Sequence, residues 1–157
     1  MVTSSSQRRT MGSYQASHDP EQLKQYRQAE RALLEHYQLA DSLQEIEINF
    51  TTSHKNRSLY GIARARVWQG GDLDATPIVF VHGGGGTPLD FAPLLPSLLK
   101  ATKNYRVICV ERPGNGTSDL FDYSRCPSEI SQFTADFLFE LLEELHVKQP
   151  AHLVANS

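Results

Sequence analysis

The stretch Pro77-Ile-Val-Phe-Val-His-Gly-Gly-Gly-Gly86 decides the fold of this chain. Its apolar run lacks alternation, which is typical of a strand buried on both faces of a sheet. The four glycines are followed by Thr87-Pro-Leu-Asp90, a pattern that favours a helix start. Glycines in such a turn leave backbone N–H groups open to a ligand. The stretch therefore predicts a site for a phosphate or for the oxyanion of an acyl-transfer intermediate.

The remaining apolar runs place this turn in a larger sheet. Val107–Val110 and Leu153–Ala155 also read as buried strands, and helical patterns separate them from each other and from Ile78–Val81. An alternating segment from Leu43 to Trp68 precedes them and predicts an antiparallel hairpin. A hairpin followed by strand–helix–strand–helix–strand predicts an α/β fold with a mostly parallel sheet.

The predicted organisation is one partial domain behind a disordered tail. The tail covers residues 1–18 and the domain covers 19–157. Within the domain we expect an N-terminal helix at 19–38, the β-hairpin at 43–68 and the parallel βαβαβ part at 77–157. Asp19-Pro-Glu-Gln22 supplies the N-cap and first-turn pattern of the helix.

Composition excludes several classes of function. The chain has 157 residues, of which 39% are hydrophobic and 21% charged, and its formal net charge is −3 with acids and bases well mixed. This mixture predicts no nucleic-acid partner, and no apolar run is long enough to span a membrane.

Cys109 and Cys126 are expected to be reduced thiols in a cytoplasmic protein. No metal-ligand spacing is present, and we expect no cofactor. Arg64 and Arg66, on one strand face, are expected to be solvated.

A dinucleotide site has a similar outline and is an alternative. Gly83 and Gly85 fit the first two glycines of that fingerprint, and Glu111 ends the next strand as a ribose-binding acid would. Pro88, however, occupies the third glycine position, and the preceding hairpin is foreign to that unit. No P-loop motif is present.

Three segments together resemble the α/β-hydrolase family. His82-Gly-Gly-Gly-Gly86 resembles the family's H-G-G-x turn after its third strand. Glu111-Arg-Pro-Gly-Asn-Gly-Thr-Ser-Asp119 resembles the D-x-P-G-x-G-x-S-D loop after the fourth strand, with Glu111 in place of aspartate. His152-Leu-Val-Ala-Asn-Ser157 resembles the fifth strand running into G-x-S-x-G, with Ala155 at the first glycine. The motifs occur in the family's order, over the chain from about Leu43 onward.

The resemblance implies a role for three residues. Ser157 would be the nucleophile, and Gly84 would donate its N–H to the oxyanion hole, with Gly85 as the alternative donor. In this family the acid and the histidine of the triad follow the serine. A serine at this position resembles the esterase, aminopeptidase and C–C hydrolase branches, whereas haloalkane dehalogenases and epoxide hydrolases carry aspartate there.

The resemblance also sets expectations for the chain as a whole. The fold is expected to be the N-terminal half of an α/β-hydrolase sheet, ending after the fifth strand. The complete protein would act on a small-molecule acyl substrate, and hydrolyse an ester, amide or C–C bond through an acyl-enzyme. This chain alone is expected to be inactive, because the acid and the histidine of the triad are absent from it. None of its own histidines is expected to act as the base, and a serine without a base is a weak nucleophile. A partner chain supplying the missing half, or a non-catalytic interaction role, are the alternatives.

Overall fold

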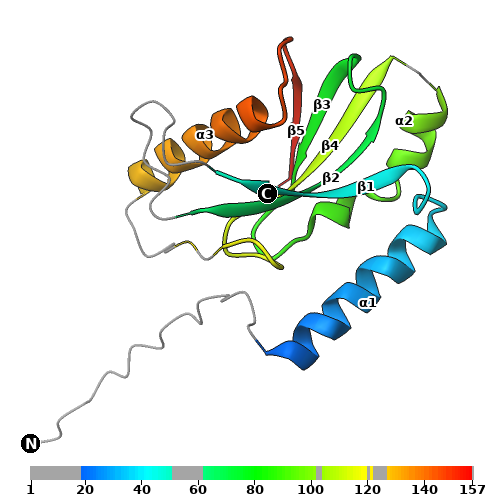
Figure 1. Cartoon of the computed structure of the whole chain (residues 1–157), viewed down its shortest axis with the longest axis horizontal. Helices are drawn as coiled ribbons and strands as arrows, with labels where there is room; N and C mark the ends of the chain where they lie inside the picture. Colours follow the sequence, from blue (N-terminus) through cyan, green and yellow to red (C-terminus); the bar gives the residue numbers. More distant parts are fainter. Residues whose placement is uncertain (1–18, 51–61, 102–103, 120, 122–126, 157) are drawn as a thin grey trace, which may run out of the picture.

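The computed structural model describes residues 19–50, 62–101, 104–119, 121 and 127–156 (Figure 1). The predicted tail at 1–18, the stretch Leu59–Gly61, Cys126 and Ser157 lie outside the described residues. The expectations that concern them therefore stay predictions.

Five strands form one mixed sheet in the order β1-β2-β4-β3-β5. The β1–β2 and β2–β4 pairs are antiparallel, and β4–β3 and β3–β5 are parallel. The predicted fold class, a hairpin followed by parallel strands with crossover helices, is confirmed. The elements in chain order are α1 (Pro20–His36), β1 (Leu43–Asn49), β2 (Arg64–Gly71), β3 (Thr76–Val81), the 3-10 helix η1 (Pro88–Phe91), α2 (Leu95–Ala101), β4 (Tyr105–Glu111), α3 (Pro127–Glu144) and β5 (His152–Ala155).

Local capping explains where two of the helices begin. The Asp19 carboxylate accepts a hydrogen bond from the Glu21 N–H at 3.0 Å, and Pro20 follows the cap. The Thr87 hydroxyl accepts from the Leu89 N–H at 3.2 Å in the same way at η1. Both caps satisfy an N–H that has no partner within its helix.

The second hairpin strand lies later in the chain than its alternating pattern predicted. β2 begins at Arg64 and continues to Gly71, so the predicted loop from Gln69 onward is strand for its first three residues. β1 pairs with β2 as far as Gly70 and β4 as far as Gly71. Pairing along both edges outweighs the weak strand preference of the two glycines.

The sheet is covered on both faces, as the non-alternating strands predicted. Figure 1 shows α3 on one side and α1 and α2 on the other. Alternate residues of β3 and β4 enter the two cores, which explains why these strands are apolar throughout. The α3 side contains Val79, Val81, Ile108, Val110, Phe133, Phe137 and Leu141, and the other side contains Leu34, Trp68, Ile78, Phe80, Leu89, Leu95, Val107 and Cys109.

β5 is an edge strand with exposed apolar side chains. It pairs with β3, and within the described residues no strand pairs with its other side. Leu153 is 60% exposed, and Val154 is 37% exposed. An apolar strand edge is a template for pairing with another chain.

We therefore predict that Leu153→Lys reduces self-association of this chain. A charge on the edge opposes strand pairing between copies, and an exposed position makes a change in unfolding free energy above about 0.5 kcal/mol unexpected. Light scattering at increasing protein concentration measures the effect. Leu94→Lys is the matched control, because Leu94 is 58% exposed but lies outside the strands. Equal effects of both substitutions would contradict the edge as the cause.

Candidate active site

The pairing of β3 with β5 brings the glycine turn next to the carboxyl end of β5. Val81 is the register partner of Ala155, and the Asn156 N–H donates to the Val81 carbonyl at 3.1 Å. Both strands run in the same direction, so the residues that follow them emerge at one edge of the sheet. The turn at His82–Gly86 and Asn156 are therefore neighbours.

The glycine turn presents two backbone donors. The Gly86 N–H donates to the Gly83 carbonyl at 3.2 Å, and Gly85 has a φ of 75°, which is the geometry of a type II turn. The Gly84 and Gly85 N–H groups donate to no acceptor among the described residues, and both glycines are exposed. A side chain built on Gly84 would meet nothing within 4 Å. These N–H groups are available to a ligand.

His82 fixes the position of the glycine turn through hydrogen bonds of its ring. Its Nε2 accepts a hydrogen bond from the Arg112 N–H at 3.1 Å, and its Nδ1 lies 2.8 Å from the Gly83 carbonyl. Because Nε2 accepts, the proton must sit on Nδ1 and be donated to Gly83. Burial lowers the pKa of His82, and the Arg112 charge adds to the effect. The imidazole is neutral, with both nitrogens in use, so the predicted structural role fits its contacts and a role as base does not.

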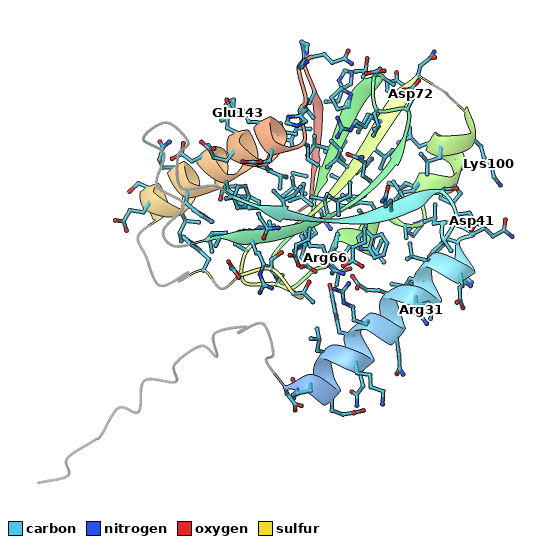
Figure 2. The ribbon with its side chains drawn as sticks, in the orientation of Figure 1. Arg31, Asp41, Arg66, Asp72, Lys100 and Glu143 are labelled. Atoms are coloured by element: carbon cyan, nitrogen blue, oxygen red, sulfur yellow. The ribbon has the colours of Figure 1, made fainter. Side chains whose placement is uncertain are left out.

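Arg66 is buried, which corrects the expectation that it is solvated. Its side chain is 3% exposed, against 51% for Arg64 two residues earlier. It forms two 2.7 Å hydrogen bonds with the Glu30 carboxylate, bonds the Glu111 carboxylate and lies 3.1 Å from the Tyr26 hydroxyl. The paired carboxylates offset the desolvation of the guanidinium. Figure 2 shows Arg66 where α1 approaches the sheet.

Glu111 connects this ion-pair cluster to the loop after β4. One carboxylate oxygen accepts from Arg66 and Tyr26, and the other accepts from the N–H and hydroxyl groups of Thr117 and Ser118 at 2.9–3.2 Å. Burial alone would raise the pKa of Glu111, but the hydrogen bond and charge of Arg66 lower it overall. With both oxygens occupied, Glu111 has no free acceptor for a ribose, which removes the basis of the dinucleotide alternative.

Sequence patterns missed the cluster of Tyr26, Glu30, Arg66 and Glu111. Tyr26 and Glu30 are four residues apart and therefore share a face of α1. That spacing indicates that Tyr26 and Glu30 lie close together, but it does not indicate that Arg66 on β2 is their partner. Among the described residues, no group of three or more His, Cys, Asp or Glu side chains is placed to hold a metal ion.

The fold and this edge define a class: an α/β domain with a glycine turn and the end of a parallel strand at one ligand-facing edge. The family model described as the alpha/beta hydrolase family matches residues 78–157, just over half of the chain. The chain belongs to the α/β-hydrolase family. No curated protein sequence matches it. None of the described helices is long and apolar enough to cross a bilayer.

Solved structures with the same fold cover several chemistries. The Cif epoxide hydrolase from Acinetobacter nosocomialis is 24% identical with a TM-score of 0.60, and the match covers 90% of this chain and 39% of that one. A membrane phospholipase A, described as a bacterial virulence factor, is 19% identical with a TM-score of 0.59, covering 87% and 36%. The thioesterase domain of the curacin biosynthetic pathway is 20% identical with a TM-score of 0.55, covering 73% and 35%. This chain spans less than two fifths of each relative.

We predict that Arg66→Met lowers the unfolding free energy by about 3–5 kcal/mol, because it leaves two buried carboxylates without their cation. Arg64→Met is the matched control on the same strand. Its exposed pair with Asp119 predicts a loss of about 1 kcal/mol or less. Urea unfolding followed by circular dichroism measures both. Similar losses for the two variants would show that the buried cluster does not carry this stability.

We also predict that the stabilising contribution of His82 weakens as the pH falls. Its folded pKa lies below the ordinary value of 6.5, so between the two values the unfolded chain binds more protons than the folded one. Stability then decreases as the pH falls below 6.5, by at most about 1.4 kcal/mol per pH unit. The difference in unfolding free energy between wild type and His82→Gln should narrow over this range. A difference that stays constant from about pH 8 to about pH 5 would contradict a neutral, buried His82.

Proposed function

We propose that this chain is the N-terminal part of a serine hydrolase in which Ser157 is the nucleophile and Gly84 the first oxyanion donor, with Gly85 as the alternative. One observation carries the proposal. The Asn156 N–H bonds the Val81 carbonyl, so Asn156, the neighbour of Ser157 in sequence, lies beside the start of the glycine turn. A nucleophile and oxyanion donors must share one small space, and the position of Asn156 supports this arrangement.

The reaction follows from these groups. The serine hydroxyl attacks the carbonyl carbon of an ester, an amide or an activated C–C substrate and loses its proton to a base. The carbonyl oxygen becomes an oxyanion, which accepts hydrogen bonds from the turn N–H groups. Collapse expels the leaving group, which takes the proton from the base, and leaves an acyl-enzyme that water hydrolyses.

The base has to come from outside the residues described. Both nitrogens of His82 are engaged in the core. His152 opens β5, and His146 follows α3 at the opposite edge of the sheet. The family's order of motifs supports an acid and a histidine that follow Ser157 in sequence. The alternative source is a partner chain that pairs with the open edge of β5. We propose that residues 1–157 alone have little or no activity.

We also propose that the protein is cytoplasmic. Cys109 is a free thiol on β4, buried among the residues of the α1 and α2 side. Burial raises its pKa to about 12, so it is an unreactive core residue. A protonated free thiol in the core is compatible with a reducing compartment.

The first test is the intact mass of the protein from its native source, followed by an assay with an activated ester. We expect a mass above 17.6 kDa, ester turnover by that protein, and none by residues 1–157. Ser157→Ala in the active form should abolish turnover. Turnover by residues 1–157 that Ser157→Ala removes would contradict inactivity of this part. Full activity of the Ser157→Ala form would overturn Ser157 as nucleophile.

The oxyanion role of Gly84 is tested by two substitutions in the same ester-hydrolysing form. Proline suits the second position of a type II turn, so Gly84→Pro removes the N–H while the turn keeps its shape. Gly84→Ala keeps the N–H, and its added methyl group meets no atom within 4 Å. We expect Gly84→Pro to lower kcat by about 10²–10³-fold and Gly84→Ala to change it little. Equal kcat values for the two variants would move the role to Gly85.

A further inference from the structure

A cavity of about 290 Å³ lies at the opposite edge of the sheet from the glycine turn. The residues before β3, the first residues of β3 and β4, and the segment between α3 and β5 line it. In Figure 2, Asp72 marks the loop before β3 at this edge, and Arg66 lies at the other. Its lining includes Asp74, Pro77, Arg106, Leu145, His146, Val147 and Lys148.

Arg106 forms the inner wall of this cavity and is 6% exposed. Its Nε and Nη2 donate to the Gln69 side-chain oxygen at 2.9 and 2.5 Å, and Nη2 also donates to the Leu145 carbonyl at 3.0 Å. These acceptors are neutral. Nη1 donates to no acceptor among the described residues, and it is not fully buried. Nη1 therefore has protons left for a ligand, and Arg106 is a lining residue of the cavity.

This arrangement leaves a buried positive charge without a counter-ion. No carboxylate of a described residue forms an ion pair with Arg106, whereas Arg66 has three such partners. Burial lowers the pKa of Arg106, and the charge of Asp74 partly opposes this effect. A buried guanidinium whose hydrogen-bond acceptors are all neutral is incompletely compensated, and a planar anion is its best partner.

The lining distinguishes between classes of anion. Pro77, Leu145 and Val147 make much of the wall apolar, and the volume is at the small end for ligand sites. Lys148 and His146 are exposed lining residues, and Lys148 adds a positive charge. The negative charge of Asp74 disfavours binding of a multiply charged anion. We propose that the cavity binds a small organic monocarboxylate, its carboxylate on Arg106 and its short hydrocarbon chain against Pro77 and Val147. This site is independent of the serine-hydrolase proposal.

The test is isothermal titration calorimetry of the full chain with butanoate, acetate and inorganic phosphate. We expect butanoate to bind more tightly than acetate, by up to about fourfold for each methylene buried, and more tightly than phosphate. Phosphate as the tightest ligand would overturn the carboxylate class. Absence of butanoate binding at millimolar concentration by the folded chain would overturn the site.

Variants locate the binding. Arg106→Met should weaken butanoate binding at least tenfold, whereas Arg31→Gln removes an equal charge from α1, away from the lining, and should leave it unchanged. Asp74 is exposed, so Asp74→Asn tests the site even if Arg106→Met fails to fold. Loss of the repulsive carboxylate should tighten binding several-fold. Equal affinity of wild type and folded Arg106→Met, or weaker binding by Asp74→Asn, would contradict the proposal.

Discussion

The ion-pair cluster of Arg66 is the interaction on which the arrangement of this domain depends. One guanidinium joins Glu30 of α1 to Glu111 at the end of β4. Glu111 fixes the loop that follows it, and the next residue, Arg112, donates its N–H to His82. His82 in turn bonds Gly83 in the glycine turn. The position of the turn is thus coupled to a helix far earlier in the chain through contacts that are all buried or partly buried.

The two buried arginines illustrate different ways to keep a cation inside a protein. Arg66 is surrounded by ionised carboxylates, and their hydrogen bonds raise its pKa although burial alone would lower it. Arg106 is held by an amide oxygen and a backbone carbonyl, and burial lowers its pKa. The first arrangement is electrostatically complete and acts as a structural joint. The second leaves the Arg106 guanidinium with donors that can bind an anion.

Sequence patterns predicted the sheet better than its electrostatics. The apolar runs of β3 and β4 identified strands covered on both faces, and capping residues such as Asp19 and Thr87 marked two helix starts. The glycine turn was recognisable because its chemistry resides in backbone groups next to each other in sequence. The burial of Arg66 was not, because alternation shows which residues share a strand face but not that a distant helix covers it.

The order of the strands has a consequence for how this domain forms on the ribosome. β4 lies between β2 and β3, although β3 is synthesised before β4. One edge of β2 therefore stays unpaired until β4 has been synthesised. β3 likewise gains both neighbours only after β4 and then β5 emerge. The nascent chain therefore carries open, apolar strand edges until β5 has emerged. Such a topology favours delayed, concerted assembly and leaves early intermediates prone to aggregation.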